Sequence, residues 1–147
     1  MMNYIDKVAF LYIKDRKILS TLSKGKDKYY IPGGKREGSE TDIQTLVREV
    51  KEELTVDIIE SSAKFYGIFE AQAHGKAEGV IVRMTCYTAD FYGDLCADSE
   101  IAEVVWLTYA DLDKISPVDK LIFRDLFDKG LIDWFFYAIA EHEPTLT

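Results

Sequence analysis

The first pattern in this chain is an alternation of apolar and polar residues over short stretches, separated by charged or glycine-containing turns. Such stretches are typical of β-strands with one buried face. The charged turn 14–17 joins the first two of them, and the loop 73–79 joins the third and fourth into a long hairpin. The pattern therefore predicts strands at residues 8–13, 18–22, 64–71, 80–92 and 104–107.

Two other segments have the apolar spacing of amphipathic helices. The first begins at Thr41, and its aliphatic residues recur three or four positions apart: Ile43, Leu46, Val47, Val50 and Leu54. The second opens with Ser116 and Pro117, a capping residue and a first-turn proline, and extends to about Lys129 before Gly130. Strands interspersed with two helices, without internal repeats, predict an α+β fold with a mixed β-sheet between helices.

Length and composition are those of one soluble domain. A chain of 147 residues can bury a single core, and 48% hydrophobic with 30% charged residues is ordinary for a globular protein. We expect one domain over residues 1–140 and a mobile tail over residues 141–147. The apolar run 131–140 is too short to span a bilayer, so we expect it to cover the core and expect no membrane partner. Contact with a second subunit is the alternative, which leaves a monomer or a homodimer open.

The charge balance limits the partners. A net charge of −8 argues against duplex DNA or RNA, because neutralising a phosphate backbone requires a basic face. It does not exclude a small nucleotide held by a local basic loop and metal ions. The two cysteines, Cys86 and Cys96, have no metal-site spacing, and the chain has no signal-like start, so we expect a cytoplasmic protein.

The first helix carries three carboxylates close together. At about 100° per residue, Glu49, Glu52 and Glu53 fall on a side of the helix other than the apolar stripe, which predicts an exposed acidic face. A hard divalent cation would relieve their mutual repulsion, and Mg²⁺ binds one or two carboxylates together with phosphate oxygens. A solvated acidic face without a ligand is the alternative interpretation.

The residues around these carboxylates form a motif. Residues 34–56 read GKREGSETDIQTLVREVKEELTV, in which Gly34, Glu40 and the run REVKEE stand at fixed offsets. The order resembles the Nudix box, G-x5-E-x7-R-E-U-x-E-E-x-G-U with U aliphatic, at every specified position but one. The resemblance implies an α/β/α sandwich and hydrolysis of a pyrophosphate bond in a nucleoside diphosphate derivative. The exception is Thr55 in place of the second glycine. A β-branched residue adopts a left-handed helix end poorly, which leaves the helix end and the aim of Glu53 open.

A basic, glycine-rich loop precedes the helix. Residues 32–38 contain a proline and several glycines, so the backbone there can approach a ligand closely. Among the cations of this region we favour Lys35 and Arg36 for substrate binding. Surface solubility explains the others equally well, namely Lys24, Lys26 and Lys28. In the family that the motif resembles, the carbonyl group at the position of Gly33 can bind metal.

The resemblance also implies a ligand set and a reaction. Mg²⁺, or Mn²⁺ in its place, would be bound by Glu49, Glu52 and Glu53, and one carboxylate of the cluster would activate the attacking water. We favour Glu49 as the base and Glu53 next. Some family members carry a further metal-binding glutamate before a strand that contains a tryptophan. Glu100 is the candidate here and Glu103 the fallback, with an exposed loop acid as the alternative.

The expected exposure of the three glutamates has a consequence for variants. Their removal should lower turnover far more than it loosens folding. We therefore predict that Glu53→Gln lowers kcat by orders of magnitude with little change in melting temperature.

A few other polar residues invite a functional role. Arg48 is interpreted as structural support that pairs with Glu52 one turn on. His74 is a candidate for proton transfer or phosphate contact, but an exposed turn residue is favoured. Asp119 lies where related hydrolases sometimes recognise the edge of a purine base. We favour the simpler role of an acidic residue in the first turn of its helix. Tyr29 and Tyr30 are candidates for stacking on a base, and packing in the turn is the alternative.

The chain lacks the residues downstream of the box that are typical of two substrate classes. In the resembled family, ADP-ribose hydrolases often carry a proline downstream of the box, and dinucleoside polyphosphate hydrolases a tyrosine; residues 69–75 contain neither. By elimination we favour a nucleoside triphosphate, ordinary or oxidised, cleaved to the monophosphate and pyrophosphate. ADP-ribose or another nucleoside diphosphate derivative is the alternative. A second alternative is a domain that binds nucleotides without turnover, and the intact set of box glutamates counts against it.

Overall fold

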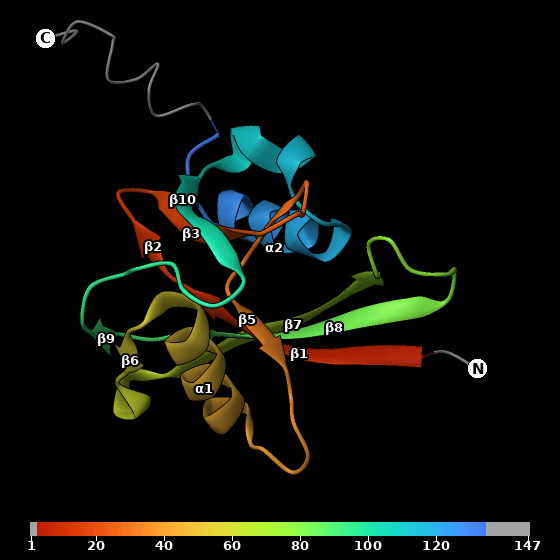
Figure 1. Cartoon of the computed structure of the whole chain (residues 1–147). Helices are drawn as coiled ribbons and strands as arrows, with labels where there is room; N and C mark the ends of the chain where they lie inside the picture. The colour runs from red at the N-terminus through yellow and green to blue at the C-terminus, as the bar shows by residue number, and fades with distance from the viewer. Residues whose placement is uncertain (1–2, 135–147) are drawn as a thin grey trace, which may run out of the picture.

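Two β-sheets lie between two helices in the computed structural model, which describes residues 3–134 (Figure 1). The first sheet has the order β5-β1-β8-β7, formed by Gly33–Lys35, Asn3–Leu11, Val80–Thr88 and Lys64–Gln72. It is mixed, because β1 and β8 are parallel whereas the other two pairs are antiparallel. The second sheet has the order β10-β3-β2, formed by Ile101–Leu107, Lys17–Ser23 and Ile13–Lys14, and β4 (Tyr29–Tyr30) pairs with β3. The expected α+β fold with a mixed sheet between helices is confirmed.

Several strand boundaries differ from those predicted. β1 begins at Asn3 and not at residue 8, because it pairs along its whole length with β8. The segment predicted as one strand over 80–92 is divided, since β8 ends at Thr88 and Phe91–Tyr92 forms β9, which pairs with β6 (Asp57–Ile58). Two short 3-10 helices, Glu60–Ser62 and Tyr109–Lys114, complete the described elements.

The helices α1 (Asp42–Leu54) and α2 (Pro117–Asp128) cover opposite sides of β1. Side chains alternate across a strand, so Val8 and Phe10 pack in one core cluster while Ala9 and Leu11 pack in the other. The first cluster contains the apolar stripe of α1 and the second contains that of α2. The edge of this sheet at β5 therefore lies beside α1, and the glycine loop meets the glutamate-bearing helix there.

The start of α1 is fixed by a reciprocal cap. The hydroxyl group of Thr41 accepts the N–H of Gln44 at 3.2 Å, and the Gln44 side chain accepts the N–H of Thr41 at 2.9 Å. Each bond satisfies a backbone donor that has no partner inside the helix. The cap sets where the helix begins and, through the helical repeat, which way its glutamates point.

The end of α1 keeps the geometry that a glycine would give. Thr55 adopts a left-handed conformation with φ 62° and ψ 19°, and its N–H donates to the carbonyl group of Lys51 at 3.1 Å. The hydroxyl group of Thr55 donates to the Leu54 carbonyl at 2.6 Å. The helix end is thus formed despite the departure from the motif, with a β-branched residue in a strained region of φ/ψ space.

Replacing Thr55 by glycine should relieve this strain. The left-handed conformation costs a non-glycine residue about 1–2 kcal/mol, and part of the gain is lost to the greater freedom of glycine in the unfolded chain. We expect Thr55→Gly to raise the free energy of unfolding by about 0.5–1 kcal/mol in urea denaturation. Thr55→Ala, which keeps a Cβ in the same conformation, is the matched control and should not be stabilised. Equal stabilities of both variants would show that the strain is absent.

The last part of the chain lies outside the described residues. The predicted tail 141–147 and most of the apolar run 131–140 therefore stay predictions, as does the extent of the domain. Among residues 3–134, no helix combines the length and the apolar character that crossing a membrane requires.

Candidate active site

Arg48 holds the loop between β5 and α1 against the helix. Its guanidinium group donates two hydrogen bonds to the carboxylate of Glu40, both at 2.8 Å, and one to Oε1 of Glu49 at 2.8 Å. It also donates to the carbonyl group of Lys35 at 3.0 Å. The predicted pairing with Glu52 is the weaker one, since those atoms lie 3.7 Å apart. Arg48 holds the pKa of Glu40 near 2, so this carboxylate stays charged. Arg48 therefore supports the site, through partners that the sequence alone did not indicate.

Glu53 is buried, and the expectation of an exposed face was wrong for it. It is 7% exposed, and Oε1 accepts the backbone N–H of Gly33 at 3.0 Å. Its side of α1 is covered because β5 packs there. Burial raises the pKa of Glu53 to about 8; the Gly33 hydrogen bond opposes this, and the negative charges of Glu49 and Glu100 add to it. Before any cation binds, Glu53 is mostly protonated at neutral pH.

Glu49 lies directly above a glycine of β5. Its side chain is 14% exposed. A Cβ added at Gly34 would overlap the Glu49 carboxylate, so only glycine leaves room for it. Burial raises the pKa of Glu49, whereas the Arg48 hydrogen bond lowers it. Glu52, by contrast, is 54% exposed. The three box glutamates thus differ in environment although they share one helix.

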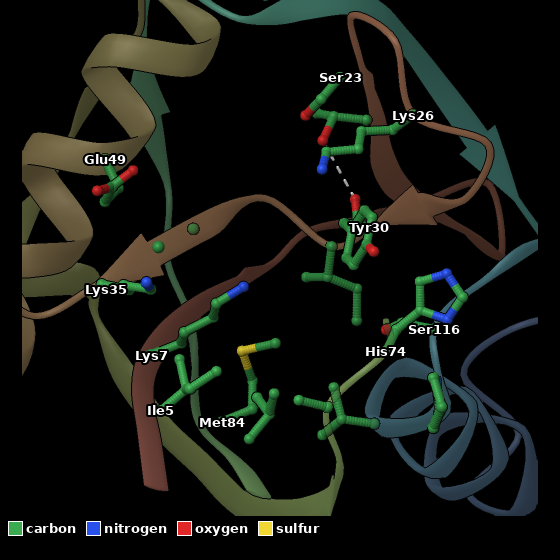
Figure 2. Close-up of a pocket in the computed structure, with 18 of the residues that line it drawn as sticks. Ile5, Lys7, Ser23, Lys26, Tyr30, Lys35, Glu49, His74, Met84 and Ser116 are labelled. Atoms are coloured by element: carbon green, nitrogen blue, oxygen red, sulfur yellow. Dashed lines mark hydrogen bonds between the residues drawn. The ribbon is translucent and has the colours of Figure 1, made fainter. Parts of the chain in front are cut away.

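One continuous pocket of about 550 Å³ runs from Glu49 and Glu53 toward α2 (Figure 2). Glu49 and Lys35 lie toward one end, and Tyr30, His74 and Ser116 lie toward the other. Gly33, Glu53 and Glu100 also line it, whereas Glu52 and Glu103 do not. The structure therefore brings most of the predicted site residues to one cavity.

Arg36 points elsewhere. Its guanidinium group donates to Asp6 at 3.0 Å and to Asp42 at 2.6 Å, and to the carbonyl group of Glu40 at 3.0 Å. These carboxylates raise the pKa of Arg36 further above its usual value. Arg36 is not among the residues that line the pocket, unlike Lys35. Its observed contacts connect β1, the loop and the start of α1, and substrate binding by either residue stays a prediction.

The donor atoms fit a hard divalent cation. The carboxylates of Glu49, Glu53 and Glu100 face one pocket. Burial raises the pKa of each of the first two, and the negative charge of Glu100 adds to the rise. Carboxylate and carbonyl oxygens are the ligands that Mg²⁺ prefers. Within residues 3–134, no three His, Cys, Asp or Glu side chains are already gathered as metal ligands. Glu53 is instead bonded to Gly33, and Glu49 to Arg48.

The sequence did not indicate that Lys7 lines the pocket or that Asp119 is buried. Lys7 lines the pocket, but the predicted strand began after it. A signal was available, since Lys7 interrupts an alternation that includes Ile5 and Ala9. Asp119 does lie in the first turn of α2 but is fully buried, and its Oδ2 accepts the N–H of Ile31 at 3.0 Å. Its Oδ1 has no hydrogen-bond partner within the described part of the chain, and burial raises its pKa to about 7.

Comparison with known proteins agrees with this geometry. The family model described as NUDIX domain matches residues 5–126. The ORF135 protein of E. coli is 26% identical, with 98% of this chain and 96% of that chain covered and a TM-score of 0.62. The MutT protein of Methanosarcina mazei Go1 is 16% identical (88% and 96% covered, TM-score 0.71), and a UDP-X diphosphatase is also 16% identical (88% and 65% covered, TM-score 0.61). The search of curated proteins found no match.

The glycine-containing β5 and the glutamate-bearing α1 pack together at the edge of a mixed sheet, as the Nudix box predicts. The chain belongs to the NUDIX domain family, as its match over residues 5–126 shows. The resemblance seen in the sequence is thereby confirmed. Members of this family are hydrolases that act on phosphoanhydride bonds of small nucleotide substrates, generally with a divalent metal ion.

Proposed function

We propose that this protein hydrolyses a nucleoside triphosphate, ordinary or oxidised in its base, to the monophosphate and pyrophosphate. The observation that supports this is the continuous pocket, with carboxylates and Lys35 at one end and Tyr30 and Ser116 at the other. A volume of about 550 Å³ is within the range of small-molecule sites. A polyphosphate fits the end that carries the carboxylates and Lys35, and a nucleoside fits the end beside α2.

The reaction uses groups with separate tasks. Lys35 binds phosphate oxygens and neutralises part of their charge. Glu49 accepts a proton from the attacking water, and its raised pKa brings it closer to neutral pH, where a general base works best. Glu53 is the second candidate for this role. Gly34 leaves the space that the Glu49 carboxylate occupies.

The metal ion would be Mg²⁺, with Mn²⁺ as the alternative. Glu49, Glu52, Glu53 and Glu100 would hold it together with the Gly33 carbonyl group. When bound, such an ion stabilises negative charge on the pyrophosphate leaving group. Because Glu53 must lose its proton to act as a ligand, ion binding should strengthen as the pH rises toward about 8.

A second candidate substrate is a nucleoside diphosphate linked to another group. The structural similarity to a protein named UDP-X diphosphatase favours this class, and ADP-ribose belongs to the same chemistry. A domain that binds nucleotides without turnover is the third possibility. A cytoplasmic location and a monomeric or homodimeric state remain predictions from the sequence.

One assay separates these candidates. Release of nucleoside monophosphate and of pyrophosphate is measured for ordinary and oxidised triphosphates, ADP-ribose, UDP-sugars and dinucleoside polyphosphates, with Mg²⁺, with Mn²⁺ and with chelator. We expect chelator-sensitive pyrophosphate release from a triphosphate. Turnover confined to the diphosphate derivatives would replace this substrate class with the second candidate. No turnover by the folded protein would leave a binding domain.

A further inference from the structure

A lysine interrupts the apolar face that β1 turns toward α2. Ala9 and Leu11 belong to the core cluster of that face and Ile5 packs against it, yet Lys7 stands among them, half-buried and lining the pocket. Burial lowers the pKa of Lys7, because an ammonium group removed from water is disfavoured in its charged form. An apolar residue would fill this position without that cost, so the charge calls for a chemical explanation.

The charged groups that face Lys7 come from three elements: Asp119 on α2, Lys35 on β5, and Glu49 and Glu53 on α1. The carboxylates act on Lys7 only at a distance, since none of them forms a hydrogen bond or an ion pair with its ammonium group within residues 3–134. The ring of Tyr30 lies 5.9 Å from Nζ, which is within the range of a cation–π contact. Lys7 is therefore surrounded by charge and still has open access to the pocket.

Two lysines lie side by side where β1 and β5 line the pocket. Lys7 and Lys35 are directly paired positions of the β1–β5 ladder, and both line the pocket. Their repulsion contributes to the lowered pKa of Lys7. In the described part of the chain, the side chain of Lys35 has no ion pair either. An anion that enters the pocket between the two ammonium groups would relieve this repulsion and accept hydrogen bonds from both.

The position of Lys7 along the pocket indicates which part of a nucleotide it meets. Figure 2 shows Lys7 between Glu49 and Lys35 on one side and Tyr30 and Ser116 on the other. We propose that Lys7 binds the phosphate group that is attached to the nucleoside, while Lys35 binds phosphates nearer the glutamates. This assignment rests on the proposed function, because it assumes a nucleotide that lies along the pocket.

A structural role is the competing explanation. Lys7 is then retained only to offset the buried negative charge of Asp119, whose pKa it lowers. Such a role would affect folding, or every ligand equally. Contact with a phosphate group would instead affect only ligands that carry one. The effect of a Lys7 substitution on the affinity for a nucleoside monophosphate, compared with its effect on the affinity for the same nucleoside, therefore distinguishes the two explanations.

Calorimetry with AMP, GMP, CMP and UMP and with the four corresponding nucleosides, in the presence of EDTA, tests the proposal. For the wild-type protein we expect at least one monophosphate to bind more tightly than its nucleoside. Lys7→Met should lower the affinity for that monophosphate by about 10- to 100-fold, since one charge-assisted hydrogen bond is lost. The affinity for the nucleoside should stay unchanged. Lys7→Arg should restore most of the affinity. Lys64→Met removes the same charge from an exposed position on β7 and should change neither affinity.

Three results would overturn the assignment: unchanged monophosphate affinity in Lys7→Met, an equal loss for monophosphate and nucleoside, or no preference of the wild-type protein for any monophosphate. If Lys7→Met does not fold, Lys7→Gln gives the same comparison with a polar group in place. The substrate assay on the wild-type protein is read independently. Absence of triphosphate turnover contradicts the proposed function, whereas turnover with Lys7-independent binding contradicts only this inference.

Discussion

Glutamine in place of Glu53 should lower kcat by roughly 10²- to 10³-fold and, in the absence of metal, should stabilise the protein. The loss of activity follows because an amide neither holds a divalent ion nor accepts a proton as a carboxylate does. The gain in stability follows from burial. A neutral amide fits the covered site beside Gly33 and still accepts its N–H, whereas a carboxylate there must either bind a proton or bury a charge.

The sign of the pH dependence follows from the raised pKa of Glu53. Below its unfolded value near 4.5 both states are protonated, and the stabilising effect of the buried neutral form is fully present. As the pH rises toward about 8, the unfolded chain releases its proton first, so the metal-free wild-type protein loses stability through this window. Glu53→Gln avoids the loss. We expect its advantage in free energy of unfolding to grow to about 4 kcal/mol at pH 8, measured by urea denaturation in EDTA.

Glu52→Gln is the matched control on the same helix. Its side chain is 54% exposed, so its stability relative to wild type should not change with pH in this way. If Glu53→Gln instead showed the same small difference at pH 5 and pH 8, Glu53 would not be buried as described. Near-normal turnover in Glu53→Gln would remove this residue from the site. The sequence alone had predicted little change in melting temperature.

Alanine in place of Gly34 should lower kcat/KM by about 10²-fold without unfolding the protein. The added Cβ would lie 2.6 Å from Oε1 of Glu49 and overlap the rest of its carboxylate. The overlapping atoms are the free end of a side chain, so Glu49 can rotate away from Arg48 at little cost in stability. Because a shift of about 1 Å in a catalytic group can cost about 10²-fold in rate, we expect a loss of that order in kcat/KM. Steady-state kinetics and thermal melting measure the two effects separately.

Two other glycines provide the comparison. A Cβ at Gly33 would overlap the backbone carbonyl oxygen of Val8 and lie 2.9 Å from the Cα of Ala9, at a φ of 140°. Gly33→Ala should therefore fail at folding. A Cβ at Gly67 on β7 meets only the side chain of Phe69, at 3.3 Å, so Gly67→Ala should retain activity. Full activity in Gly34→Ala would mean that Glu49 does not act from its observed position.

The sequence predicts those parts of the fold that bury a regular apolar stripe. The two helices and the long strands do so, and their periodicity is visible along the chain. β4, β5, β6 and β9 have only two or three residues each and leave no periodic signal. The first residues of β1 were missed because they are mostly polar, and only their pairing with β8 identifies them as strand.

The sequence motif was enough to locate the site. The burial and the contacts of its side chains could be determined only from the folded structure. Helical spacing shows that Glu49, Glu52 and Glu53 share a side of α1, yet it contains no information on what lies against that side. β5 covers Glu53 and leaves Glu52 exposed. Likewise, spacing suggested Glu52 as the partner of Arg48, while the stronger contact comes from Glu40 in the preceding loop. Interactions between elements determine these differences, and a single element cannot reveal them.

The parallel pairing of β1 with β8 affects how the protein is made. Asn3 pairs with Val80 and Leu11 with Thr88, so β1 stays unpaired on that side until β8, more than 60 residues further along the chain, has left the ribosome. During that interval its apolar residues, Val8 to Leu11, are open to association with other chains. A fragment that ends before Val80 should therefore aggregate. The side of the pocket that β1 and β8 form together, which includes Lys7, is completed only after β8 has been synthesised.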